Sequence, residues 1–111
     1  MEARLRTELW IKALIRRCDI AAIAVAVVVR GDGDSGAVLL KFNAPHAGCS
    51  VLAQARGSEG ELIWTRATGP APVAESAADT YIARQRRYDP DLWVVEIETA
   101  SPATVLDGHI V

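Results

Sequence analysis

The sequence has few of the residues from which catalytic sites are built. Its 111 residues include two histidines and two cysteines, Cys18 and Cys49. Two cysteines are too few for the disulfide framework of a small secreted domain. Cys18 falls on the apolar side of an expected helix, where a cysteine is typically a core residue. No serine lies in a nucleophile motif, so no triad of nucleophile, base and orienting group is visible. The sequence therefore predicts no catalytic residue.

A metal site has little support. His46 and Cys49, in the pattern His-x-x-Cys, would supply two ligands. Structural zinc usually takes four ligands, from two closely spaced pairs. Because no second pair is present, we expect an exposed loop histidine beside a strand cysteine, and no bound metal or cofactor.

No stretch is long enough to cross a membrane. The apolar run over residues 20–29 has ten residues, whereas a transmembrane helix needs about 20. Arg16 and Arg17 precede this run, as basic residues do in a signal peptide. However, Asp19 interrupts the pattern, and Arg30 follows with no cleavage site of small residues. We therefore expect a cytoplasmic protein that does not bind membranes.

A large net charge is also missing. The net charge of −2 argues against a dedicated, sequence-indifferent nucleic-acid binder. The charges are unevenly placed, because residues 1–17 carry five basic and two acidic side chains, and residues 89–111 carry five acids and no lysine or arginine. The two ends are expected either to attract each other or to face separate partners.

The composition that is present is typical of a globular domain. Half of the residues are apolar and 23% are charged. A chain of this length fits one domain that buries roughly 65% of its unfolded surface. The sequence has no repeat and no low-complexity segment. We expect a single domain over residues 1–111, with loosely ordered ends at 1–6 and 99–111.

Apolar periodicity predicts seven elements. A helix is expected over residues 7–19 and another over 73–88, which ends before Asp89-Pro90 because proline disfavours a helical residue before it. Five strands are expected over residues 24–30, 37–42, 49–56, 61–68 and 92–98. The order α-β-β-β-β-α-β predicts an α+β domain, with a mainly antiparallel sheet and both helices packed on one face.

The first expected strand also predicts self-association. Residues 24–30 are apolar on both faces of the strand until Arg30, and only two helices are available to cover the sheet. A second subunit is therefore expected on the far face, in a homodimer.

Residues 31–36, with the sequence Gly-Asp-Gly-Asp-Ser-Gly, match the G-x-G-x-x-G pattern of dinucleotide-binding sites. That pattern requires a helix directly after the glycines, and a strand is expected here. The acid required about 20 residues further on is replaced by Arg56. The same loop begins like a calcium loop, but its later ligand positions hold Gly36, Ala37 and Asn43. We interpret it as the turn joining the first two strands, with glycines supplying positive φ. A weak cation contact through Asp32 and Asp34 stays open.

Residues 84–93, Arg-Gln-Arg-Arg-Tyr-Asp-Pro-Asp-Leu-Trp, are the most informative segment. Arginines beside aromatic residues can bind phosphate, stack on bases or contact a protein. The three arginines fan over about 160° of the helix surface. The simpler alternative is therefore a solvated helix face followed by a turn-forming Asp-Pro-Asp, whose acids could pair with Arg86 or Arg87. The candidate binding rim is Arg84, Arg87, Asp89, Asp91 and Trp93. Weaker candidates are Asp32, Asp34, Arg16 and Arg17.

Three blocks of the sequence resemble one protein family. They lie within residues 4–17, 31–38 and 81–98, and the last block is the most specific. They are similar to the small alphaproteobacterial family of unknown function known as DUF1491. The resemblance covers nearly the whole chain up to about Glu98. It implies a bacterial cytosolic single-domain protein, and it implies no activity, substrate or catalytic residue.

Three hypotheses about function follow. The leading one is a non-enzymatic binding or regulatory module that contacts a protein or a small anionic ligand through the rim. The second is an RNA- or nucleotide-associated protein, using the basic residues of both helices: Arg4, Arg6, Lys12, Arg16, Arg17 and Arg84–Arg87. The third is a carboxylate- or metal-dependent enzyme, which requires Asp32, Asp34, Asp89 and Asp91 to converge in space.

Overall fold

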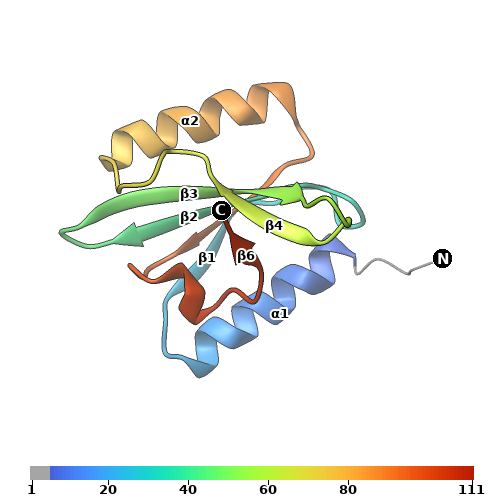
Figure 1. Cartoon of the computed structure of the whole chain (residues 1–111), viewed down its shortest axis with the longest axis horizontal. Helices are drawn as coiled ribbons and strands as arrows, with labels where there is room; N and C mark the ends of the chain where they lie inside the picture. Colours follow the sequence, from blue (N-terminus) through green and yellow to red (C-terminus); the bar gives the residue numbers. More distant parts are fainter. Residues whose placement is uncertain (1–5) are drawn as a thin grey trace.

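The computed structural model describes residues 6–111 and shows a sheet between two helices (Figure 1). Arg4, one of the basic residues considered for RNA binding, lies outside these residues. The helices are α1 (Thr7–Ile20) and α2 (Glu75–Tyr88). The strands are β1 (Val25–Val29), β2 (Val38–Ala44), β3 (Gly48–Arg56), β4 (Leu62–Arg66), β5 (Trp93–Ile97) and β6 (His109–Ile110). No helix within the described part of the chain is long and apolar enough to cross a bilayer.

Every expected helix and strand is present in the expected order, which confirms the α+β class. The second helix begins at Glu75, two residues later than expected, and both helices end within a residue of their predicted ends. The tail, expected to be loosely ordered, contains a short 3-10 helix, Pro102–Thr104, and the additional strand β6. Val105 and Leu106 of the tail are buried in the core.

The sheet is mixed, with the strand order β1-β5-β2-β3-β4-β6. The pairs β1–β5, β2–β3 and β3–β4 are antiparallel, whereas β2–β5 and β4–β6 are parallel. The last long strand, β5, is therefore inserted between β1 and β2. The expected tight turn between the first two strands is wrong for this reason, because residues 30–37 have to cross the end of β5.

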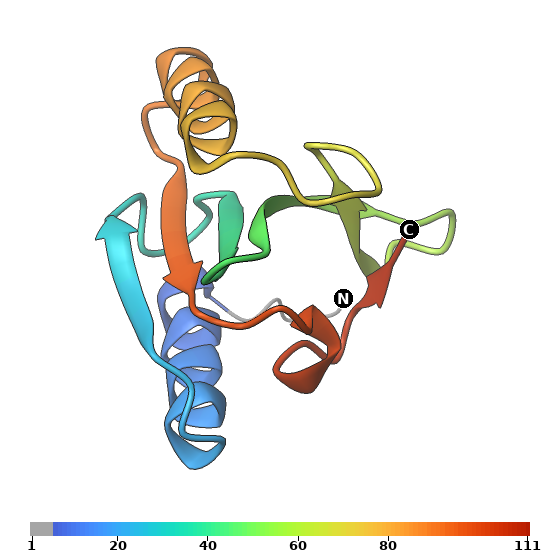
Figure 2. The same ribbon diagram turned by 90° about the vertical axis from the view of Figure 1, so that its left-hand side faces the viewer.

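The two helices lie on opposite faces of the sheet, which corrects the expectation that both pack on one face (Figures 1 and 2). The reason is the composition of the central strands. In β2, Leu40 and Phe42 belong to the core beneath α1, whereas Leu39 belongs to the core beneath α2. In β5, Val95 faces the first core and Val94 the second. Because both faces of these strands are apolar, each face needs a helix.

Strand β1 lies at the edge of the sheet. It pairs with β5 along one side, and its other side has no strand partner among the described residues. Val27 and Val28 are 41% and 55% exposed. The apolar character that suggested a buried strand therefore belongs to an exposed edge.

Candidate functional site

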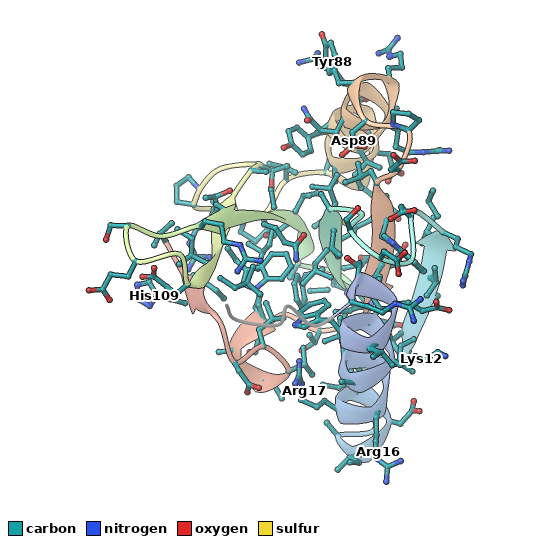
Figure 3. All side chains as sticks on the ribbon, turned by 90° about the vertical axis from the view of Figure 1, so that its right-hand side faces the viewer. Lys12, Arg16, Arg17, Tyr88, Asp89 and His109 are labelled. Carbon is teal, nitrogen blue, oxygen red and sulfur yellow. The ribbon has the colours of Figure 1, made fainter. Side chains whose placement is uncertain are left out.

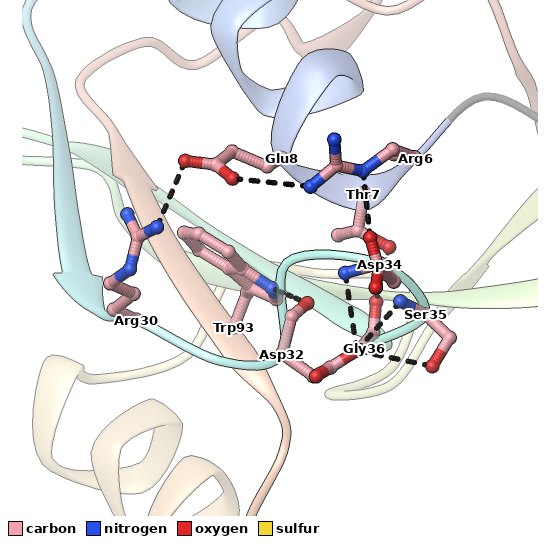
Figure 4. Close-up of polar contacts among 9 residues, drawn as sticks. All are labelled: Arg6, Thr7, Glu8, Arg30, Asp32, Asp34, Ser35, Gly36 and Trp93. Atoms are coloured by element: carbon pink, nitrogen blue, oxygen red, sulfur yellow. Dashed lines mark hydrogen bonds and ion pairs between the residues drawn. The ribbon is translucent and has the colours of Figure 1, made fainter.

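The loop of residues 31–36 uses its first aspartate to fix its own shape (Figure 4). The Asp32 carboxylate accepts hydrogen bonds from the backbone N–H groups of Ser35 and Asp34, at 2.8 and 3.1 Å, and from the Ser35 hydroxyl at 3.2 Å. The Ser35 N–H and hydroxyl are the main groups that lower the pKa of Asp32 below its ordinary value. The carboxylate is therefore engaged within the loop.

The same loop caps the N-terminus of α1 (Figure 4). The backbone N–H of Glu8 donates to the carbonyl of Gly33 at 3.0 Å, and that of Thr7 to the carbonyl of Asp34 at 3.3 Å. Arg6 also forms a 2.7 Å ion pair with Asp34. These carbonyls take helix N–H groups that would otherwise bind a phosphate. The motif is followed by β2 and covers the end of a different helix, so its geometry is not that of a dinucleotide site.

Two glycines of the loop are required by close approach and not by backbone conformation. A Cβ at Gly31 would lie 2.7 Å from the carbonyl carbon of Leu92, and closer still to the Asp91 carbonyl oxygen. A Cβ at Gly36 would lie 2.5 Å from the same oxygen and 2.9 Å from Trp93 Cδ1. Neither glycine has a left-handed φ, which corrects the expectation of positive φ in this loop. The glycines let the loop rest directly on the start of β5.

Trp93 is part of the core and not of an exposed rim. It is 1% exposed, and its indole N–H donates to the backbone carbonyl of Asp32 at 2.6 Å. The Arg30 guanidinium lies 5.1 Å from the ring centroid and forms a 2.9 Å ion pair with Glu8. The hydrogen bond that Arg30 donates to Glu8, together with the positive charge of Arg30, lowers the pKa of Glu8. Trp93 joins the loop, α1 and β5, and its ring is not accessible to a partner.

The other rim residues lie at the end of α2, as Figure 3 shows for Asp89. Arg84, Arg87 and Asp91 are exposed and Asp89 is half-buried. Asp89 accepts a 3.0 Å hydrogen bond from the Asp91 backbone N–H. Within residues 6–111 neither aspartate forms an ion pair with an arginine of α2. The exposed arginines and the Asp89–Asp91 turn match the solvated face of the simpler alternative, without its local Asp–Arg pairs. Tyr88 is 79% exposed.

A hollow of about 170 Å³ lies beside this helix end, between α2 and the sheet. It is lined by Ala37, Val38, Leu39, Ala53, Gln54, Tyr81, Gln85, Asp89 and Leu92. Its lining mixes apolar side chains with four polar residues, Gln54, Tyr81, Gln85 and Asp89. Of these, Gln54 already accepts a 2.7 Å hydrogen bond from the Val38 backbone N–H. Partial burial raises the pKa of Tyr81, so its hydroxyl stays protonated and neutral at ordinary pH. Asp89 is the member of the predicted rim that lines the hollow.

The aspartates do not form a shared metal site. The Asp32 carboxylate closes its loop, Asp34 pairs with Arg6, and Asp89 bonds to the backbone of Asp91. The loop and the α2–β5 junction do touch, through a 3.0 Å backbone hydrogen bond from the Asp32 N–H to the Asp91 carbonyl. No cluster of three or more metal-ligating side chains occurs in the described part of the chain. The third hypothesis therefore lacks the convergence that it requires.

His46 and Cys49 do not form half of a metal site, because the histidine faces solvent and the cysteine is buried. His46 is exposed with a φ of 72°, whereas Cys49 is 1% exposed in the core beneath α2. Burial raises the pKa of the Cys49 thiol and that of Cys18. Both thiols are free and protonated at neutral pH.

The basic residues of α1 lie far from the end of α2 (Figure 3). Lys12 and Arg16 are exposed. Arg17 donates to the Val105 carbonyl at 2.9 Å and pairs with Asp107 at 3.2 Å, so the basic head and acidic tail do attract each other at this point. Because α1 and α2 cover opposite faces, their basic residues do not form one continuous surface for RNA.

One polar cluster was missed by sequence reasoning. Lys41 of β2 is buried, and its Nζ lies 2.7 Å from Glu75, 2.8 Å from Asp79 and 3.5 Å from Glu96. Asn43 donates to both Glu75 and Glu96. Burial alone would lower the pKa of Lys41, but the hydrogen bonds that its ammonium donates to Asp79 and Glu75 outweigh that effect and raise the pKa. The available signal was a lysine inside an apolar strand, because a buried charge needs carboxylate or other hydrogen-bonding partners.

Comparison with known proteins gives the family and the fold. The family model described as "Protein of unknown function (DUF1491)" matches residues 5–107. A crystal structure of a DUF1491 family protein from Caulobacter crescentus is 32% identical, with a TM-score of 0.86 over 97% of this chain and 100% of that one. A solution structure of a protein from A. tumefaciens is 30% identical, with a TM-score of 0.81 over 96% and 95% of the two chains. No protein with a curated description matches.

Proposed function

This chain belongs to the DUF1491 family, whose function is unknown, and we propose that it is a protein-binding module that acts through the end of α2. The observation that carries the proposal is the hollow beside Asp89, at the junction of α2 and β5. The sequence placed the candidate rim at the same junction on independent grounds, from its arginines and aromatic residues.

The size of the hollow favours a protein over a small molecule as the partner. Pockets for cofactors and drug-sized ligands are usually about 300–1,000 Å³. The hollow, at about 170 Å³, is smaller than that range and suits a single apolar side chain. A side chain inserted there would meet Leu39 and Ala53, with Gln85 available for a hydrogen bond.

The surroundings of the hollow define the chemistry of the partner. Arg84 and Arg87 are exposed, and Tyr88 beside them is 79% exposed. Arginine and tyrosine are enriched among the residues that dominate binding energy in protein interfaces. We therefore propose an acidic partner segment that carries one apolar anchor residue. The place of action that we propose is the cytoplasm, in keeping with two free thiols.

Affinity capture from a lysate of the source organism tests the proposal. The bait is the whole chain, and the variant Arg84→Glu/Arg87→Glu reverses the charge at the end of α2. Lys12→Glu/Arg16→Glu is the matched control, because it makes the same charge change on the exposed face of α1. We expect an acidic protein whose recovery falls by about tenfold or more with the α2 variant and is unchanged with the control.

A second variant tests the hollow itself. Ala37 lines the hollow with an exposed side chain, so Ala37→Leu should fill the space without disturbing the core. Recovery of the same protein should fall with this variant. Equal recovery of every protein by the wild type and both variants of this surface would refute the assignment. Retention of RNA that is lost with Lys12→Glu/Arg16→Glu would favour the RNA hypothesis instead.

A further inference from the structure

Lys41 is a buried cation held by the helix that carries the proposed site. Its side chain is 6% exposed, whereas those of Glu75 and Asp79 are 56% and 57% exposed. The two carboxylates are four residues apart on α2, so they lie one above the other on the same side of the helix. They meet Nζ at 2.7 and 2.8 Å. The lysine thus reaches from the strand to two successive turns of α2.

The remaining contacts of α2 with the sheet are few. Ala78 and Ile82 are its buried side chains, and Tyr81 is partly buried against the same core. Its N-cap residue, Ala74, makes no side-chain cap. An isolated helix of 14 residues is marginal in water, so α2 depends on its docking to the sheet. A helix with so little apolar anchoring needs another interaction to fix its position along the strands.

The charged groups around Lys41 come from α2 and β5, while the strand on its other side, β3, places Val51 opposite it. Glu75 and Asp79 come from α2, and Glu96 comes from β5, 3.5 Å away. Asn43, on β2, donates to Glu75 at 3.3 Å and to Glu96 at 3.2 Å, which joins the helix to the sheet a second time. The cluster therefore defines one position of α2 over β2 and β5.

We propose that Lys41 is an ionic latch that positions α2, and so sets the shape of the binding hollow; this inference rests on the proposed function. Tyr81 and Gln85, which form a wall of the hollow, follow Asp79 within the next two turns of the same helix. Leu39, two residues before Lys41 on the same face of β2, also lines the hollow. A rigid helix pinned at Asp79 therefore holds Tyr81 and Gln85 at a fixed distance from Leu39.

The burial of the lysine predicts an asymmetry between variants. Removing the carboxylates leaves a desolvated ammonium with Glu96 as its nearest counter-charge. Removing the lysine leaves two carboxylates that are more than half exposed and remain hydrated. Loss of one side of a buried ion pair is costly when a charge is stranded, and mild when the remaining group is solvated. Glu75→Gln/Asp79→Asn should therefore release α2 more than Lys41→Met does.

Amide hydrogen exchange on the whole chain tests the latch without any partner. Glu75→Gln/Asp79→Asn should exchange about tenfold or more faster over residues 78–88, while amides of β2 and β5 keep their protection. Lys41→Met should cause a smaller increase. Adding it to the double variant should lower exchange only to the level of Lys41→Met, because the stranded charge is gone but the latch is still broken. Glu59→Gln/Glu61→Gln in the β3–β4 turn is the matched control. Should the double variant unfold completely, Asp79→Asn alone replaces it.

Two results would overturn the latch. One is equal exchange over residues 78–88 in the double variant and the control. The other is a Lys41→Met effect as large as that of Glu75→Gln/Asp79→Asn.

The capture assay distinguishes failure of the latch from failure of the proposed function. With the latch released, recovery of the acidic partner should fall although Arg84 and Arg87 are intact. Unchanged capture by Arg84→Glu/Arg87→Glu refutes the proposed function, and the exchange result still decides the latch.

Discussion

At the scale of single residues, Gly31 shows how a motif can be retained for packing and not for cofactor binding. Its missing side chain lets the loop lie against Asp91 and Leu92. The second glycine of the motif, Gly33, should tolerate a side chain better than Gly31 does. A Cβ there would lie 3.2 Å from the flexible end of the Glu8 side chain, which can move away. A phosphate-binding motif would require both glycines, whereas packing requires Gly31 and not Gly33. The two positions therefore distinguish a structural role from a role in phosphate binding.

We predict different costs for the two alanine variants. Gly31→Ala should lower the free energy of unfolding by about 3 kcal/mol, because the new methyl group meets backbone atoms that cannot move away. Gly33→Ala should cost less than about 1 kcal/mol. Chemical denaturation of both variants measures the difference. Equal losses would contradict the packing account of this loop.

The Asp32 carboxylate predicts a dependence of stability on pH. Its pKa is lowered in the folded state, mainly by the N–H and hydroxyl of Ser35. Its contribution to the free energy of unfolding is therefore complete above the pKa of the unfolded state, about 4. That contribution is lost as the pH falls through the lower pKa of the folded state. Asp32→Asn should show a smaller loss of stability than the wild type between about pH 4 and pH 2. Parallel pH profiles for the two proteins would contradict this prediction.

The sequence identified most of the polar and aromatic residues of interest, but not the partners or the burial that the fold gives them. The aspartates of the loop were recognised from the sequence, but their partners lie in Ser35 and in the separate helix α1. Trp93 looked available beside the arginines, and it is buried because β5 is a central strand. Lys41 was overlooked because its partners are more than 30 residues away, at Glu75 and Asp79.

At the scale of elements, the ends of the helices differ in how they are satisfied. The first N–H groups of α1 donate to the loop of residues 31–36. The N-cap of α2, Ala74, has extended φ and ψ angles but no side-chain hydrogen bond. Serine at this position can accept a hydrogen bond from an N–H of the first turn.

We therefore predict that Ala74→Ser stabilises the protein. The gain should be about 1 kcal/mol, the usual value of a serine N-cap over alanine. For a domain of this size it should raise Tm by roughly 4 °C. Ser76→Ala, at an exposed position two residues further on, should leave Tm nearly unchanged and serves as the control. If calorimetry shows no rise in Tm, the inference that the N-terminus of α2 lacks a stabilising cap is contradicted.

The elements themselves were predicted closely, and their arrangement was not. Local periodicity and turn residues fixed the helices and strands to within a few residues, because these signals are local. The insertion of β5 beside β2 depends on pairing between residues about 55 positions apart, such as Val38 and Trp93. No local pattern contains that information, so the mixed sheet and the opposite placement of the helices came only from the structure.

At the scale of the whole molecule, β1 is the surface on which we base a prediction of self-association. Val25–Val29 carries no charged residue, and exposed apolar edge strands tend to pair with another chain. We expect a homodimer in which β1 strands from two copies pair antiparallel. Val27→Lys should convert it to a monomer, and Ile20→Lys, at an exposed site on α1, should not. Sedimentation measures both, and a monomeric wild type at about 100 μM would contradict the prediction, since that concentration exceeds micromolar dissociation constants.

The central claim, that a partner binds at the end of α2, is tested most directly by site-specific photo-cross-linking. A photoreactive phenylalanine analogue replaces Tyr88, which is 79% exposed, or Leu9 of α1, which is 48% exposed, in otherwise identical full-length proteins. We predict that the probe at position 88 cross-links the captured acidic protein and that the probe at position 9 does not. Cross-linking of that protein from position 9 with none from position 88 would contradict the claim.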